Sequence, residues 1–384
     1  MRRELFLQRA VRARRTGRGL IAVEALAGFL ALAVGASLDV TRRFWPAGAD
    51  VELAARFWPG LPGERTIALL DAADGETIAE MDVPAGPFAD VPVRLSRVTE
   101  GGATLWEMAG ERWPRALVLQ ARAGGRPVGT PLILEVLREP PRLSDAWSAR
   151  LWRAVESGDQ AAARSLLELP AGARRELREA VDDAPPPAEL AGPLGVLVHR
   201  DHRLIMRTTA GEMTLALRWD AAPRTCAHVL SLAQLGVYEG VTFHRILAED
   251  AQGRPFFVQT GDPTGTGLGG CGWRIDFERS SLEHEFGVVS LARLPSDVNS
   301  GSSQLIMCLS REACAGLDGV YASFAVVERG GGVLRRVARG TAGGDEASDP
   351  PTVRSVSVVP APPYVSPPVA DVPLRLAPRG RIAR

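Results

Sequence analysis

Three glycines in the second half of the chain have the spacing of a phosphate-binding loop. Gly265, Gly267 and Gly270 fit the pattern G-x-G-x-x-G. Such a loop holds phosphate when it lies between a buried strand and a helix N-terminus, whose backbone N–H groups point at the anion. Residues 271–278 are too rich in glycine and β-forming side chains to begin a helix, and the chain contains no lysine for a Walker-type site. We therefore interpret residues 259–273 as a tightly turning loop with no nucleotide, because glycine permits the positive φ angles that such turns need.

The cysteines and histidines lack the spacing of a metal site. The cysteines have no C-x-x-C pattern of the kind seen in zinc and redox sites, and they are too few for a disulfide scaffold. His199 and His202 lie three residues apart, but no third ligand accompanies them. The sequence therefore predicts neither a metal nor a cofactor. Three complete pairings, or no disulfide at all, stay open for the four cysteines, which are Cys226, Cys271, Cys308 and Cys314.

The bulk composition is that of an ordinary globular protein with room for two or three cores. The chain has 384 residues, of which 46% are hydrophobic and 23% are charged. Its 45 basic and 45 acidic residues give a formal net charge of zero. No global field would attract nucleic acid, so we expect no nucleic-acid partner.

One arginine lies on a strand that follows a hairpin and a helix. Residues 204–217 predict the hairpin, because apolar and polar residues alternate along its second strand. Pro223 begins a helix that ends at Gly236. Residues 241–247 return to a strand, which carries Arg245. An isolated arginine on a strand is usually a surface residue, so its role depends on the residues around it.

Those surrounding residues give a specific resemblance. The stretches GEMTLALRWDAAPRTCAHVLSLAQLGVYEGVTFHRI, FFVQTGDPTGTGLGG, GVVSLAR, NSGSSQLIMCL and GLDGVYASFAVV follow one another in the order typical of cyclophilin-type peptidyl-prolyl isomerases. The resemblance spans about 140 residues, the size of one compact domain. It implies a mainly β fold over residues 190–340, with a closed eight-stranded antiparallel barrel and two capping helices. It also implies that the glycine-rich stretch is a surface loop beside a proline-binding groove.

The resemblance further implies which residues act on a substrate. Arg245 matches the catalytic arginine of the family. Proline-containing polypeptides are the implied partners, and the reaction needs no metal or cofactor. The positions that match substrate-binding residues are Phe256, Phe257, Gln259, Ala292, Arg293, Gln304, Ile306, Leu317 and Tyr321.

An arginine suits this reaction for a physical reason. Amide resonance imposes a barrier of about 18–20 kcal/mol on rotation about the X-Pro bond. When the bond twists, the imide nitrogen becomes pyramidal and regains a lone pair, to which a guanidinium can donate. The planar ground state cannot accept this hydrogen bond, so the interaction would stabilise only the transition state.

Several positions depart from the family pattern. Ile306 stands where the family usually has a phenylalanine at the floor of the proline pocket, which predicts a differently shaped fit to the ring. Gly316 replaces a large aromatic residue, and Arg293 replaces a common asparagine. Residues 248–255, beside Arg245, are longer and more polar than usual. A second hypothesis therefore stays open, in which a catalytically weak cyclophilin-like module binds proline motifs or acts as a scaffold.

The N-terminus has the pattern of a membrane-insertion signal. Seven arginines within residues 1–18 precede an apolar run over residues 20–38, which only Glu24 interrupts. A run of about 19 residues can cross a bilayer as a helix, and the arginines would hold its N-terminal side in the cytoplasm. We expect a transmembrane anchor or signal segment at residues 19–40, with the bulk of the protein outside the cytoplasm. A cleavage site at residues 34–36 and a pilin-like segment at residues 19–24 are the alternatives.

The rest of the chain divides by composition. Short apolar runs between Gly, Pro and Asp breaks predict a β-rich accessory domain at residues 50–140, shaped as a small sandwich or barrel. Helical periodicity predicts a helical linker at residues 143–183. The proline content of residues 341–384 predicts a disordered tail. Together these features predict a membrane-tethered prolyl isomerase that assists the folding of exported proteins.

Overall fold

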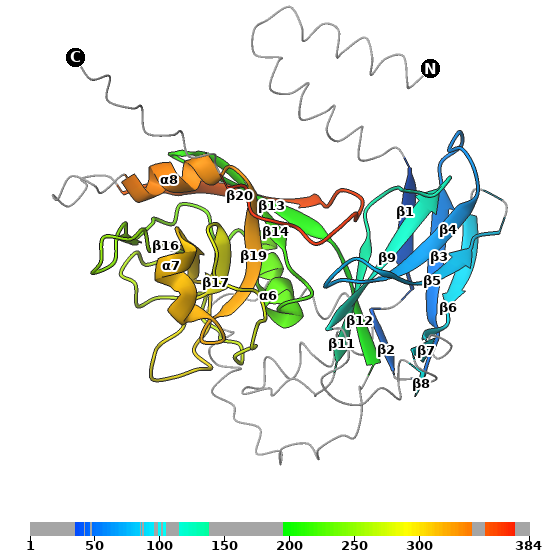
Figure 1. Cartoon of the computed structure of the whole chain (residues 1–384), viewed down its shortest axis with the longest axis horizontal. Helices are drawn as coiled ribbons and strands as arrows, with labels where there is room; N and C mark the ends of the chain where they lie inside the picture. The colour runs from blue at the N-terminus through cyan, green and yellow to red at the C-terminus, as the bar shows by residue number, and fades with distance from the viewer. Residues whose placement is uncertain are drawn as a thin grey trace, which may run out of the picture.

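The computed structural model describes three ranges of the chain (Figure 1). They are residues 35–137 apart from 42, 47, 85, 87, 96–98, 101–102 and 105–114, then residues 195–339, and then residues 350–372. The basic N-terminus at residues 1–18, most of the expected membrane segment and the expected helical linker at residues 143–183 lie outside the described residues.

The N-terminal part of the chain is β-rich, as expected, and forms two sheets that pack on a shared core, which we call the β-sandwich. One sheet has the order β1-β3-β6, from β1 (Ala36–Val40), β3 (Val51–Phe57) and β6 (Phe88–Val93). The other has the order β2-β12-β11-β9-β4-β5, from β2 (Phe44–Pro46), β12 (Gly195–Arg200), β11 (Leu132–Leu137), β9 (Ala116–Ala123), β4 (Arg65–Asp71) and β5 (Thr77–Asp82). The short β10 (Arg126–Pro127) pairs with β9, and β7 (Thr99–Glu100) pairs with β8 (Ala103–Thr104).

The end of the expected membrane segment is a strand of this sandwich. Residues 36–40 form β1, which pairs along its length with β3. Strand β1 alternates between buried and more exposed residues, because only one of its faces meets the core. The limit of the expected segment at residue 40 is therefore wrong. Within the described ranges, no helix is long and apolar enough to cross a membrane.

Strands β4, β9 and β11 in the middle of the second sheet are buried on both faces, and the sequence shows why. In β3, residues facing the core alternate with exposed ones, as in a strand that is wet on one side. In β9, by contrast, Leu117 and Leu119 point into the sandwich core, whereas Ala116 and Val118 join the core of the following domain. A continuous apolar run is typical of a strand covered on both sides.

The second domain is an eight-stranded antiparallel sheet that curls into a barrel. Its strand order is β15-β16-β18-β17-β19-β14-β13-β20. The two edges meet, because Thr242 bridges to Thr352 and the Phe243 N–H donates to the Pro351 carbonyl at 2.8 Å. The strands are β13 (His202–Thr208), β14 (Gly211–Leu217), β15 (Arg245–Leu247), β16 (Phe257–Thr260), β17 (Val288–Leu291), β18 (Leu305–Cys308), β19 (Ala322–Arg329) and β20 (Val353–Pro360).

Two helices contribute apolar residues to the barrel core. Helix α6 (Pro223–Gln234) begins at the expected proline, and α8 (Gly331–Arg339) follows β19. Val229 of α6 and Leu334 of α8 are fully buried in the same cluster as the inward-facing strand residues. A four-residue helix, α7 (Arg311–Cys314), and a 3₁₀ turn at Ala315–Leu317 lie between β18 and β19. The expected closed eight-stranded barrel with two capping helices is confirmed.

The expected disordered tail at residues 341–384 is wrong over most of the described C-terminal range. Residues 353–360 form β20, which pairs with β13 and supplies the closing edge of the barrel. The prolines flank this strand or end it, while Val353 and Val356 are buried. Proline lacks only the N–H donor, so it is compatible with a strand end and with an edge strand. A high proline content therefore does not by itself predict a disordered segment.

The domain limits also differ from those expected. Strand β12 pairs with β2 and β11, so residues 195–200 belong to the β-sandwich although we expected them in the barrel domain. Only Asp201 separates β12 from β13. The two domains are thus joined by continuous strands.

Candidate active site

Strand register places three of the expected site residues in one row across the barrel. Arg245 of β15 lies opposite Gln259 of β16, which in turn lies opposite Ile306 of β18. Residues directly opposite one another in a sheet project to the same face. The guanidinium of Arg245 is exposed, whereas Ile306 is buried and can form the floor of a slot.

Two phenylalanines adjoin this row. Phe257 precedes Gln259 by two residues on β16 and therefore shares its face. The guanidinium carbon of Arg245 lies 5.2 Å from the centroid of the Phe257 ring. Phe256 packs edge-on against Phe257, with ring centroids 4.6 Å apart. The arginine therefore stands over an apolar surface.

The two glutamines connect this surface to the glycine-rich loop. Gln259 Nε2 donates to Gln304 Oε1 at 2.6 Å. Gln304 Nε2 donates to the carbonyls of Gly267 at 3.0 Å and Gly269 at 2.8 Å. The amide of Gln304 therefore holds the loop at one side of the groove.

The glycine-rich loop binds a carboxylate of its own chain. The backbone N–H groups of Thr264, Gly267 and Gly269 all donate to the carboxylate of Asp262, at 2.6–3.1 Å. Burial raises the pKa of Asp262, but these hydrogen bonds more than offset it and hold the pKa below its usual range. Gly267 has a φ of +80°, which the turn requires. The donors that a phosphate would need are occupied by Asp262.

The opposite wall contains the remaining expected residues. Arg293 donates from Nε to the Val320 carbonyl at 2.8 Å, and its guanidinium carbon lies 5.3 Å from the Tyr321 ring centroid. Ala292 precedes it and is half-buried, and Leu317 ends the 3₁₀ turn. The Arg293 side chain is therefore held along the wall by its neighbours.

A pocket of about 320 Å³ lies between the glycine-rich loop and this wall. Gln259, Gln304, Ala292 and Arg293 line it, whereas the other six expected site residues do not. The sequence analysis missed four larger lining residues, which are Leu268, Trp273, Arg274 and Leu294. They lie in irregular segments, where neither periodicity nor a motif indicates which way a side chain points.

A hydrogen-bonded chain behind the groove has the side-chain types of a hydrolase triad. Ser290 Oγ lies 2.6 Å from His284 Nε2, and His284 Nδ1 lies 2.9 Å from Asp318 Oδ1. Ser290 and His284 are completely buried, so no substrate can reach the hydroxyl. Burial, partly offset by Asp318, lowers the pKa of His284, so the ring is neutral at neutral pH. Since Ser290 lies opposite Ile306, we assign this chain to supporting the groove floor.

The described ranges contain no cluster of side chains that forms a metal site. No three His, Cys, Asp or Glu side chains gather there in a way that could hold a metal ion. The groove and its pocket instead offer the exposed guanidinium groups of Arg245 and Arg274, two amides and an apolar floor. That combination can bind a neutral, partly apolar group and donate hydrogen bonds to it.

Comparison with known proteins identifies relatives of the barrel domain. The model of the family described as "Cyclophilin type peptidyl-prolyl cis-trans isomerase/CLD" matches residues 203–358, which include β20. A peptidyl-prolyl cis-trans isomerase-like 1 of Rhizopus delemar is 38% identical over 139 residues, covering 35% of this chain and 78% of the relative. A peptidyl-prolyl cis-trans isomerase of Synechococcus elongatus is 36% identical over 124 residues, covering 32% of this chain and 79% of that relative.

The chain was also compared with solved structures. A cyclophilin-type peptidyl-prolyl cis-trans isomerase of Cryptosporidium parvum, crystallised in the presence of the dipeptide Ala-Pro, is 25% identical, with a TM-score of 0.36. The match covers 41% of this chain and 98% of that chain.

Proposed function

This chain belongs to the cyclophilin-type peptidyl-prolyl cis-trans isomerase family, and we propose that it uses Arg245 to isomerise X-Pro bonds in exported polypeptides. Isomerase activity follows from the family. The catalytic role of Arg245 rests on one observation, namely that an exposed guanidinium stands over Phe257 and in line with Gln259 and Ile306.

The surroundings of Arg245 support this role. Among the described residues, its guanidinium contacts the Phe257 ring and has no hydrogen-bond acceptor. Its donors are therefore free for the imide nitrogen of a twisted X-Pro bond. The buried face around Ile306 would hold the proline ring while the preceding carbonyl rotates. Each group acts by binding and orientation, without a nucleophile.

An isomerase assay on the full chain tests the assignment. Arg245→Ala should lower kcat/KM for an X-Pro peptide at least about ten-fold, equivalent to about 1.4 kcal/mol of transition-state stabilisation. Arg329→Ala is the matched control, because Arg329 is an exposed strand arginine on β19, away from the groove row. Equal rates for wild type and Arg245→Ala would exclude Arg245 as the catalytic residue.

The place of action is a separate part of the proposal. The arginines of residues 1–18 and the apolar run that follows support a membrane anchor that exports the rest of the chain. Because residues 36–40 form β1 and pair with β3, the proposed anchor must end before this strand. Proline-containing clients outside the cytoplasm would then be the substrates.

Fractionation and N-terminal mapping test this part. A membrane-bound protein that begins at Met1 and is digested by protease from the outer side is the expected result. An N-terminus near Ser37 would indicate a cleaved signal, and one at Leu20 would indicate pilin-like processing. A soluble cytoplasmic protein that begins at Met1 would contradict export.

A further inference from the structure

The β-sandwich and the barrel share one hydrophobic core. Leu70 of β4, Val118 of β9 and Ile133 of β11 are buried in the same cluster as Leu204 of β13 and Val229 of α6. All five are at most 2% exposed. The sandwich is therefore packed against the barrel and does not hang from a linker.

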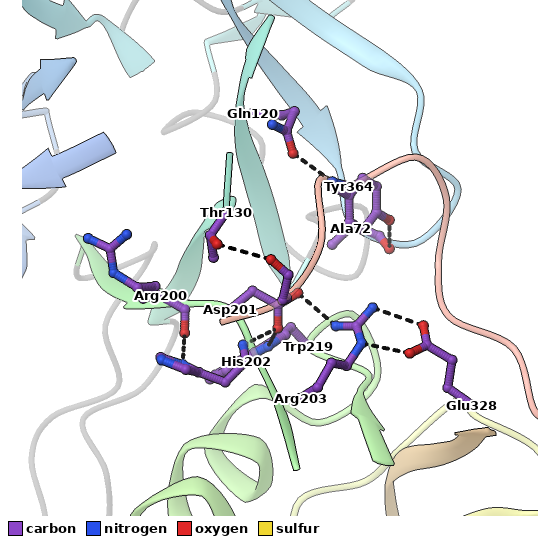
Figure 2. Close-up of polar contacts among 11 residues, drawn as sticks. Ala72, Gln120, Thr130, Arg200, Asp201, His202, Arg203, Trp219, Glu328 and Tyr364 are labelled. Atoms are coloured by element: carbon purple, nitrogen blue, oxygen red, sulfur yellow. Dashed lines mark hydrogen bonds and ion pairs between the residues drawn. The ribbon is translucent and has the colours of Figure 1, made fainter. Parts of the chain in front are cut away.

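The C-terminal segment 361–372, which we call the strap, crosses from the barrel to the sandwich (Figure 2). Thr130 Oγ1 donates to the Ala361 carbonyl at 3.0 Å. The Tyr364 N–H donates to Gln120 Oε1 at 2.6 Å, and the Tyr364 hydroxyl donates to the Ala72 carbonyl at 2.9 Å. Gln120 is fully buried, so its side-chain oxygen is shielded from water and accepts this hydrogen bond inside the protein. The strap fixes the two domains relative to each other.

A second polar contact crosses the interface nearer to the groove. Arg115, at the start of β9, donates from Nη1 to the Ala221 carbonyl at 2.7 Å and also to the Arg279 carbonyl. Ala221 lies just before α6. Arg279 lies near the end of residues 273–280, which we call the wall segment. One sandwich side chain therefore holds two backbone positions of the barrel.

The wall segment extends from this contact to the groove. Trp273 and Arg274 line the 320 Å³ pocket. The Phe277 ring centroid lies 5.7 Å from the guanidinium carbon of Arg293, the wall residue described above. Glu278 accepts hydrogen bonds at 2.8 Å from the N–H and the hydroxyl of Thr225 in α6.

Helix α6 connects to the same pocket. Trp273 Nε1 donates to His228 Nδ1 at 3.3 Å, so the other ring nitrogen of His228 donates to the Ser302 carbonyl at 2.6 Å. Both Trp273 and Ser302 line the pocket. Arg115 thus holds the backbone just before α6 and the end of the wall segment. The wall segment lines the pocket, and α6 contacts the pocket-lining Trp273 and Ser302 through His228.

We propose that Arg115 of the β-sandwich is a positioning residue for the isomerase groove, acting through the wall segment and α6. This inference rests on the proposed function of the groove. The sandwich would then be part of the substrate-binding apparatus, since it sets the position of the pocket wall. A wall that binds substrate and transition state alike affects KM and not kcat.

The test compares four variants of the full chain in the isomerase assay. Arg115→Met should raise KM about three-fold or more while kcat stays within about two-fold. Arg115→Lys keeps a charged donor and should restore part of the affinity. Arg126→Met changes an exposed sandwich arginine and should leave KM unchanged. Tyr364→Phe weakens the strap without touching the wall and should lower the unfolding temperature but not change KM.

Each result bears on the proposal. A lower unfolding temperature for Arg115→Met with unchanged KM would overturn it, because Arg115 would then be only structural. Should Arg115→Met not fold, Arg115→Gln takes its place in the same assay: an unchanged KM in the folded variant would overturn the proposal, whereas an increased KM would support it. An inactive wild type would refute the proposed function instead. In that case, a changed peptide Kd of Arg115→Met or Arg115→Lys would still support positioning, and an unchanged Kd would reject it.

Discussion

The groove and the region where the two domains meet both contain arginines, but they use them differently. Arg245 in the groove is exposed, and in the described part of the chain it contacts only an aromatic ring. Arg203 beside the interface is 8% exposed and bonds Asp201 at 3.1 Å and Glu328 at 3.0 Å (Figure 2). A guanidinium with its own carboxylates fixes the architecture. A guanidinium that has no acceptor among the described residues leaves its N–H donors available to a substrate.

The two regions also differ in how their other polar groups are bonded. Asp201 accepts from Trp219 Nε1 and from the His202 N–H, and its own backbone bonds Pro131 and Ala361. At the groove, Gln259 is buried and Gln304 is half-buried, and the Gln304 amide holds a loop that is otherwise turned toward solvent. Hydrogen bonds therefore hold the domain interface together, and the groove lies on elements that this interface supports.

The largest expected effect comes from removing β20 and the strap. A chain ending at Asp349 should lose cooperative thermal unfolding and isomerase activity, because the barrel loses its closing strand and β13 is left as an open edge. A chain ending at Val372 is the control, since it keeps every described residue. Circular dichroism and gel filtration measure the outcome. A cooperative, active chain ending at Asp349 would show that the tail is dispensable.

Substituting the two contrasted arginines should separate stability from activity. Arg203→Met leaves Asp201 buried without its partner and should cost about 3–5 kcal/mol of unfolding free energy. Arg245→Met should change that free energy by less than about 0.5 kcal/mol, as expected for an exposed side chain, while lowering kcat/KM. Urea unfolding and the peptide assay provide the two measurements. Similar stability losses for both variants would remove the distinction.

The glycine-rich loop should respond to acid, because Asp262 binds it much as the interface carboxylates bind their partners. The folded-state pKa of Asp262 lies below the unfolded value, so its stabilisation is present above about pH 4 and is lost as the pH falls through the folded pKa. Asp262→Asn should therefore lower the unfolding free energy at pH 7 and approach wild type at low pH. Asp82→Asn changes an exposed aspartate and is the control at pH 7, where it should unfold like wild type. A constant difference between Asp262→Asn and wild type would contradict this assignment.

The smallest expected effect distinguishes two tyrosines. Tyr364→Phe removes the hydroxyl that bonds Ala72 across the interface and should cost about 1 kcal/mol. Tyr321→Phe in the groove should cost nothing measurable, because its hydroxyl has no acceptor in the described ranges. Parallel unfolding curves of the two variants are the measurement. Equal losses would mean that the strap contact does not stabilise the protein.

Much of the barrel could be predicted because its motifs are local. The strand with Arg245, the glycine-rich turn and the helix beginning at Pro223 each depend on residues close together in the sequence. The assignment of Arg245, Gln259 and Ile306 to one site came from the family resemblance and not from spacing, since they lie on three different strands, whose register only the structure shows. The site roles themselves stay predictions that the assays above must test.

Other features had a signal that composition concealed. The apolar runs at residues 66–70 and 116–120 lie within the expected β-rich accessory domain, and apolar runs of this kind are typical of strands covered on both faces. The strand at residues 353–360 was hidden by its flanking prolines. Proline content does not show where the prolines lie, and prolines at the ends of a strand are compatible with that strand.

The sequence by itself determined the family and the barrel, and it indicated the arginine that we propose for X-Pro chemistry, because these depend on motifs within one continuous domain. Only the tertiary structure decided that the tail closes the barrel, that the sandwich shares its core, and that Arg115 reaches the wall segment. Contacts between residues up to 292 positions apart, such as Tyr364 with Ala72, leave no local pattern, since each partner is an ordinary residue in its own segment.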